Sequence, residues 1–170
     1  DIRTPRGTVR VQSALVGRPN VYHILAAVSL STALDLPFDA IERGVAALAG
    51  VPGRFEVISS AADGITVVVG CAHTGDARRK LGDAARALAQ GRLITVFGCR
   101  GNRDRTKSPL MGAVASRLSA TIIITSDNPR SENPASILRD IEQGIKETGK
   151  TNYVLCEDRK EAIGRALQKA

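Results

Sequence analysis

The chain has 170 residues and a formal net charge of +7, and 43% of its residues are hydrophobic while 3% are aromatic. This length and composition indicate one domain, or one domain joined to part of another, with an aliphatic core. No apolar run reaches about 18 residues and no signal-peptide pattern is present, so we expect a cytoplasmic protein without a membrane span. Three Phe and two Tyr provide few rings for stacking on bases, so we do not expect nucleic-acid binding. A site for phosphates and carboxylates accounts for the excess of positive charge.

The cysteines and histidines do not have the spacing of a metal site. Cys71, Cys99 and Cys156 form no C-x-x-C pair, and the sequence has two histidines. Structural zinc is usually held by four Cys or His ligands that come in closely spaced pairs. We therefore predict no metal site, and we interpret the cysteines as buried free thiols.

The N-terminal third of the chain predicts an extended segment followed by two helices. Residues 1–17 read as extended, and the alternating stretch TVRVQ has no obvious hairpin partner downstream. Asn20 can cap a helix over residues 21–34, which is apolar on most sides and is therefore expected to be buried. A second amphipathic helix is predicted over residues 38–48, before a Val-Pro-Gly linker. These elements offer too little surface to bury the first helix, so we expect them to belong to a larger domain of a longer protein.

From residue 54 onward, short apolar runs alternate with helical patterns. Runs that are apolar almost throughout predict strands buried on both faces, so we expect a mostly parallel sheet with helices on both sides. Ser108-Pro109, Asn133-Pro134 and the pair Asp158 and Glu161 are typical of helix N-termini. The predicted strands are 65–69, 93–97, 121–125 and 153–156, with a further edge strand at 55–59, and the predicted helices are 76–89, 109–118, 134–146 and 159–167.

Two polar loops follow neighbouring predicted strands, where an open parallel sheet binds its ligands. The first contains GNRDRTKS, which is not a phosphate loop because Thr106 stands where that pattern needs glycine. The second, SDNPRSENP, contains a turn that Pro129 stiffens, so that Arg130 is presented as a fork for a carboxylate. A loop offering both signs of charge suits a zwitterionic amino acid, but a solvated basic loop and a simple capped turn remain open. The polar candidates are Arg103, Asp104, Arg105, Lys107, Asp127, Asn128, Arg130 and Glu132.

A third loop, GCAHTGD, follows the predicted strand at residues 65–69. Its His73 stands at a strand end, which suits a ligand contact. Loop histidines are also commonly structural, so both interpretations remain open.

Five short segments, in order along the chain, carry a resemblance to one known family. Together they extend over essentially the whole chain, and the DNPR tetrapeptide is the most specific of their motifs. The segments are NVYHILAA (20–27), VPGRFE (51–56), CAHTGDA (71–77), VFGCRGNRDRTKSPLMG (96–112) and TSDNPRSENP (125–134).

These segments resemble the Mur ligase family, and most closely the branch that adds meso-diaminopimelate in bacterial peptidoglycan biosynthesis. The resemblance implies that residues 1–53 are the helical end of the central ATPase domain. It implies that residues 54–170 are the C-terminal Rossmann-like α/β domain, truncated at its end. By this resemblance Asp127, Asn128 and Arg130 would bind diaminopimelate, and Arg103 would bind one of its carboxylates.

The resemblance also implies a nucleotide site, formed from Asn20, Arg54 and His73. The family reaction uses ATP and magnesium to phosphorylate a carboxylate, which the amine of diaminopimelate then attacks. The family's phosphate loop, magnesium-binding acids and modified lysine are not found in these residues. The chain departs from the family pattern at His23, Gly70, Cys71 and Gly75, among other positions.

We therefore expect a fragment of an ATP-dependent ligase that adds meso-diaminopimelate to UDP-MurNAc-L-Ala-D-Glu. We assign no catalytic residue, and we expect no turnover and no tight binding of ATP or magnesium by the chain alone. The alternative is a non-catalytic scaffold or interaction module that keeps the fold, with self-association through residues 21–48.

Overall fold

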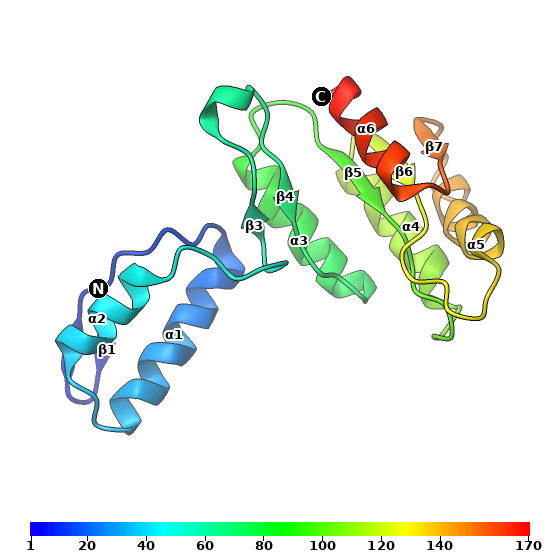
Figure 1. Ribbon diagram of the computed structural model, residues 1–170. Helices are drawn as coiled ribbons and strands as arrows, with labels where there is room; N and C mark the ends of the chain where they lie inside the picture. Colours follow the sequence, from blue (N-terminus) through cyan, green and yellow to red (C-terminus); the bar gives the residue numbers. More distant parts are fainter. The chain divides into compact units, whose positions relative to one another are not determined.

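The computed structural model describes residues 1–60 and 62–170, and residue 61 by its backbone alone. The chain divides into two compact units, Asp1–Cys71 and Ala72–Ala170 (Figure 1). Among the helices of the described chain, none has both the length and the apolar character needed to cross a bilayer.

The first unit begins with a tight antiparallel hairpin formed by β1 (Ile2–Thr4) and β2 (Gly7–Val9). The Thr4 hydroxyl donates to the Gly7 carbonyl oxygen at 2.8 Å and accepts from the Arg6 N–H at 3.3 Å, which closes the turn. The alternating stretch that we predicted to lack a downstream partner therefore pairs with residues upstream of it.

Two helices, α1 (Arg18–Ala33) and α2 (Phe38–Ala47), pack beside this hairpin. The small core of this unit contains Val9, Val28 and Ile41. The predicted cap at Asn20 is wrong, because α1 begins earlier, with Gly17 as its N-cap at φ +92°. Asn20 instead lies inside the helix, where it is buried.

The predicted burial of the first helix is not met within this unit. The buried residues of α1 are Asn20, Val28 and Thr32, which form one stripe. Ile24 is partly buried against the same core, whereas Leu30 and the C-cap residue Leu34 are 63% and 66% exposed.

The end of the first unit is an antiparallel ribbon of β3 (Glu56–Val57) and β4 (Val68–Val69), with the one-turn helix η1 (Ala61–Asp63) between them. The prediction that residues 65–69 form a strand of the parallel sheet is therefore wrong. Their apolar character suits either pairing, and the partner that they find is the segment predicted as an edge strand.

The second unit is built on a three-stranded parallel sheet in the order β5-β6-β7. Each connection between its neighbouring strands carries a helix, as parallel pairing requires. In chain order the elements are α3 (Gly75–Leu88), β5 (Ile94–Phe97), α4 (Lys107–Leu118), β6 (Thr121–Ile124), α5 (Pro134–Lys146), β7 (Tyr153–Leu155) and α6 (Arg159–Lys169).

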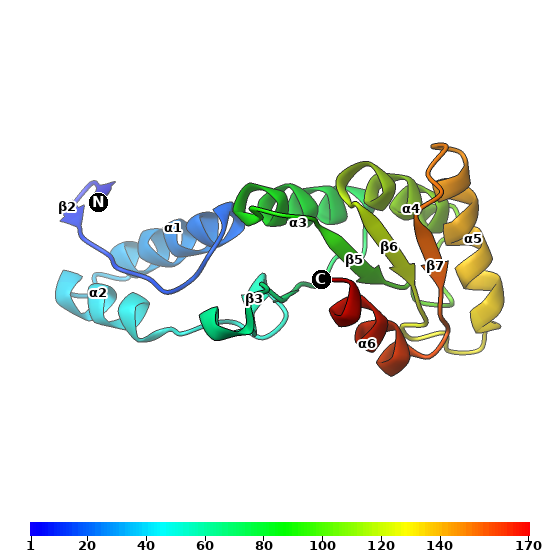
Figure 2. The same cartoon turned by 90° about the horizontal axis from the view of Figure 1, so that it is seen from above.

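Both faces of this sheet are covered, which confirms the predicted fold class. Ile122 and Ile124 on β6 pack into the core made with α4 and α5, whereas Ile123 between them packs with Ala162 of α6. All three are fully buried, since successive side chains of a strand point to opposite faces. Figure 2 shows α4 and α5 on one side of the sheet and α6 on the other.

Helices α4 and α5 cross in close contact through glycines. A methyl group at Gly144 would overlap the Pro109 carbonyl oxygen, and one at Gly112 would overlap the Ile141 carbonyl oxygen. Hydrogen alone at these positions lets the backbones meet, and this crossing holds the beginning of α4 against α5.

The helix N-termini in this unit agree with the sequence signals in two cases out of three. The Asn133 carboxamide oxygen accepts from the Ala135 N–H at 2.8 Å, and the Asp158 carboxylate accepts from the Glu161 N–H at 2.7 Å. The predicted Ser108 cap is wrong, because α4 begins at Lys107 and Ser108 lies buried within its first turn.

Candidate functional site

Two loops, residues 98–106 and 125–133, follow β5 and β6 at the same edge of the sheet. The Gly101 N–H donates to the Asn128 carbonyl oxygen at 2.9 Å. A Cβ at Gly98 would overlap the Thr125 carbonyl oxygen, and one at Gly101 would overlap the Pro129 carbonyl oxygen. The absence of a side chain at Gly98 and Gly101 therefore lets the two loops lie backbone against backbone.

A second set of hydrogen bonds joins the loops at Asn102, which the sequence analysis did not select. Asn102 adopts a left-handed backbone at φ +54°, and its carboxamide bonds the Ser131 hydroxyl at 3.0 Å. Its N–H donates to the Glu132 carboxylate. Asparagine tolerates this left-handed backbone better than most residues. That preference was the sequence signal for a turn at Asn102.

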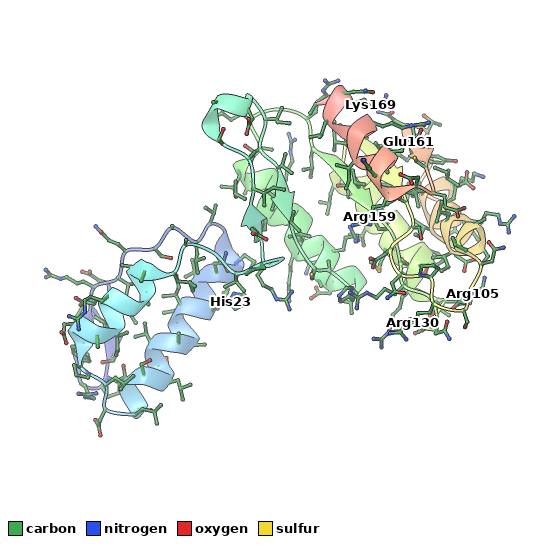
Figure 3. The ribbon with its side chains drawn as sticks, in the orientation of Figure 1. His23, Arg105, Arg130, Arg159, Glu161 and Lys169 are labelled. Carbon is green, nitrogen blue, oxygen red and sulfur yellow. The ribbon has the colours of Figure 1, made fainter. Side chains whose placement is uncertain are left out.

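Arg130 stands at the tip of the second loop in a tight turn. The Glu132 N–H donates to the Pro129 carbonyl oxygen at 3.0 Å, and Arg130 between them has φ +53°. A non-glycine residue in this region carries strain of about 1–2 kcal/mol, which the surrounding hydrogen bonds must offset. The turn leaves the Arg130 side chain exposed, as Figure 3 shows beyond the ends of the strands.

Three cations of this region are paired with carboxylates. Arg105 donates to Asp140 through its Nε and Nη2 atoms at 3.0 and 2.9 Å. Lys107 lies 3.7 Å from Asp104, and Arg100 lies 3.4 Å from Asp127.

Arg103 and Arg130, in contrast, make no hydrogen bond or ion pair with any described residue. Both are exposed, as are Asp127 and Asn128. The structure thus brings the four predicted substrate residues onto two loops that are locked together, and it leaves the two predicted carboxylate ligands available.

The three predicted nucleotide residues fall in different units. In the first unit, Asn20 donates from Nδ2 to the Val16 carbonyl oxygen at 2.8 Å and lies 3.1 Å from the His23 ring, so its amide is engaged internally. Arg54 is exposed in the same unit. His73 is exposed in the second unit, next to Thr74, the N-cap of α3.

One buried cation was missed by the sequence analysis. Arg78 lies in the first turns of α3 and is 9% exposed, with its guanidinium carbon 3.9 Å from the centroid of the Phe97 ring. Burial lowers the pKa of Arg78 to about 10, nearby Cys99 and Asp127 partly oppose this, and Arg159 reinforces it. Arg78, Leu81 and Ala85 are spaced three and four residues apart and so lie on one face of the helix. This spacing was the sequence signal that Arg78 would be buried.

The described residues contain no group of three or more His, Cys, Asp or Glu side chains placed to hold a metal ion. Cys99 and Cys156 are buried free thiols, whereas Cys71 is exposed, contrary to the prediction for that residue. Burial is the main cause that raises the pKa of Cys99, which favours the neutral thiol.

The sheet, its two helical layers and the paired polar loops define an α/β domain whose candidate site lies at the carboxyl ends of the strands. A family model described as "Mur ligase, glutamate ligase domain" matches residues 53–170, and the chain belongs to the Mur ligase family. The matched segment begins before the division of the compact units at Cys71, and a domain boundary at residues 53/54 stays a prediction.

Two relatives in sequence carry the name of the same ligase. The chain is 46% identical, over 170 residues, to UDP-N-acetylmuramoyl-L-alanyl-D-glutamate--2,6-diaminopimelate ligase of Alkaliphilus metalliredigens, covering 100% of this chain and 34% of the relative. It is 48% identical over 167 residues to the enzyme of the same name from Gloeobacter violaceus, covering 98% of this chain and 34% of that one. The chain therefore spans about a third of the length of these relatives.

Solved structures give the same result for the fold. A diaminopimelate ligase of the same name matches with a TM-score of 0.66 and 36% identity, over 99% of this chain and 34% of the other. Folylpolyglutamate synthase of Mycobacterium tuberculosis, complexed with ADP and AMPPCP, matches with a TM-score of 0.76 and 20% identity, over 96% and 36%. At that identity the second match shows a shared fold alone.

Proposed function

We propose that the chain is the amino-acid-binding part of an ATP-dependent ligase that adds meso-diaminopimelate to UDP-N-acetylmuramoyl-L-alanyl-D-glutamate. The observation that carries this proposal is the pair of unpartnered arginines, Arg103 and Arg130, on two loops joined backbone to backbone. The names of the relatives, at 46% and 48% identity, support the choice of diaminopimelate over other amino acids.

The proposed chemistry of this site is recognition of a doubly zwitterionic molecule. Each arginine fork can bind one carboxylate through two parallel hydrogen bonds. Asp127 and the Asn128 carboxamide oxygen supply acceptors for an ammonium group. Because hydrogen bonds join the two loops, we expect little ordering on binding, so that the attacking amine is held in one place for the reaction.

The other step of the ligase reaction is activation of the acceptor carboxylate, which ATP and magnesium would convert to an acyl phosphate. In this proposal Asn20, Arg54 and His73 contact the nucleotide, residues 1–53 are the end of the ATPase domain, and residues 54–170 form the amino-acid domain. The described residues supply no magnesium cluster, so the metal would be held outside them. We place the reaction in the cytoplasm, where ATP is available.

Calorimetric titration of the full chain with meso-diaminopimelate tests the amino-acid site. We expect saturable binding that Arg130→Ala weakens by about 10- to 100-fold, because a hydrogen bond to a charged group contributes roughly 1.5–3 kcal/mol. Arg139→Ala is the matched control, since Arg139 is an exposed arginine on α5 and belongs to neither loop. Equal affinity in the two variants would mean that Arg130 does not hold the ligand. The absence of binding by the unaltered chain at millimolar concentration would refute the proposed amino-acid site.

A second candidate function, an interaction module that self-associates, is favoured by the exposed apolar face of α1. Val21, Tyr22 and Leu30 of this helix and Leu34 at its C-cap are between 54% and 66% exposed. Exposed apolar surface, where it is contiguous, commonly marks a protein interface. Light scattering after size exclusion should show a species larger than one chain, and Leu30→Lys should return it to a monomer. A monomer at every concentration would remove this candidate and leave the ligase proposal untouched.

A further inference from the structure

A buried guanidinium without a hydrogen-bond acceptor lies at the carboxyl edge of the sheet. The Nε atom of Arg78 is inaccessible to solvent and finds no partner in the described part of the chain. The side chain lies over the Phe97 ring, which supports the flat face of the guanidinium but accepts no hydrogen bond from its edge. A buried donor that stays unpaired costs about 1–3 kcal/mol, more when it is charged.

The charges around Arg78 do not balance it. Asp127 attracts it and Arg159 repels it, and Arg100 already shares the Asp127 carboxylate at 3.4 Å. Arg159, at the first residue of α6, donates to the Ser126 carbonyl oxygen at 3.2 Å. Asp127 is thus already paired with Arg100 and is the one carboxylate that acts on Arg78. We call Arg78, Arg100 and Arg159 the arginine cluster.

The members of this cluster come from three different segments that meet where β5 and β6 end. Arg78 comes from α3, Arg100 from the loop after β5, and Arg159 from the beginning of α6, which Figure 3 labels. The convergence of separate segments on one point distinguishes this arrangement from a run of solvated charges along one helix.

We propose that the arginine cluster is a binding subsite for an oxyanion, a phosphate or a carboxylate group, with the Arg78 guanidinium as its buried anchor. Because Nε is sealed from solvent, a tetrahedral or planar anion would take its two parallel hydrogen bonds from the Nη atoms of the guanidinium, which the Phe97 ring holds flat. The subsite is distinct from the arginine pair on the loop tips, because neither Arg103 nor Arg130 belongs to the cluster. The two proposals share Asp127 but rest on different arginines, so variants of Arg78 and of Arg130 test them separately.

The direct test is a titration of the full chain with inorganic phosphate at constant ionic strength, read from the arginine Nε–Hε signals in NMR spectra. A parallel titration with acetate separates a phosphate source from a carboxylate source. We expect the Arg78 signal to move saturably with at least one of the two anions, while the signal of exposed Arg139 follows only the general salt effect. An Arg78 signal that neither anion moves would overturn the proposal and show that Asp127 balances the charge within the chain.

Two variants check the same conclusion by affinity. Arg78→Met keeps a long unbranched side chain over Phe97 and should weaken anion binding by about tenfold or more, since it removes a charge-assisted pair. Arg159→Gln, at an exposed position, should weaken it by a smaller factor and leaves the core unchanged. Arg139→Met is the control. If Arg159→Gln and Arg78→Met both bind phosphate and acetate as the unaltered chain does, the cluster is not the site.

Discussion

Replacing the buried arginine of α3 should stabilise the protein. Burial lowers the pKa of Arg78 from its ordinary value to about 10, which corresponds to roughly 3 kcal/mol of cost for the charged side chain in the fold. Arg78→Met removes that cost and the unpaired Nε, but it also removes the cation–π contact with Phe97, which contributes ~1–2 kcal/mol. The difference is a gain of about 1–2 kcal/mol in the free energy of unfolding at neutral pH.

Urea unfolding followed by circular dichroism measures this change. The midpoint should rise while the slope with urea stays constant, because the surface exposed on unfolding is the same. Arg139→Met should stay within about 0.5 kcal/mol of the unaltered chain, as exposed substitutions usually do. A loss of stability in Arg78→Met would refute the reasoning, since it would show that the buried charge is already compensated within the fold.

Two further changes test the packing and the electrostatics of the second unit. Gly144→Ala should lower the free energy of unfolding by about 2 kcal/mol or more, because its methyl group overlaps the Pro109 carbonyl oxygen. Gly164→Ala in α6 meets nothing within 4 Å and should raise the free energy of unfolding by about 0.5–1 kcal/mol. Urea midpoints that move in the same direction in both variants would contradict the packing account. Hydrogen bonds from Lys146 and then Tyr153 lower the pKa of Glu142 from 4.5, so its contribution is present above that pH and is lost as the pH falls through the lower folded-state value. Glu142→Gln should therefore reduce the unfolding free energy by about 1 kcal/mol at neutral pH and by progressively less as the pH falls below 4.5. A deficit that does not shrink with falling pH would show that it does not come from the carboxylate charge.

The elements with strong local signals could be predicted from the sequence. β6 is an uninterrupted β-branched run, and such a run is stable only between two covering layers, which is where it lies. The Asn133 cap needs only an amide two residues from the N–H that it accepts. The site loops also follow from order along the chain, because parallel strands must end at the same edge of the sheet.

The same local reasoning failed where a residue's partner is distant in sequence. Residues 65–69 have the pattern of a parallel strand but pair antiparallel with β3. Asn20 has the chemistry of a helix cap, yet its amide is taken by the Val16 carbonyl oxygen and the His23 ring inside α1.

What only the tertiary structure decided is which charges are neutralised. The sequence shows a dense run of arginines, but Asp140, 35 residues away, pairs with Arg105 while no described residue pairs with Arg103. Arg78 looks like one more surface cation until Phe97 is placed beneath it. Local hydrogen bonds and periodicity are encoded within a few residues, whereas charge pairing and desolvation depend on segments that meet only after the chain has folded.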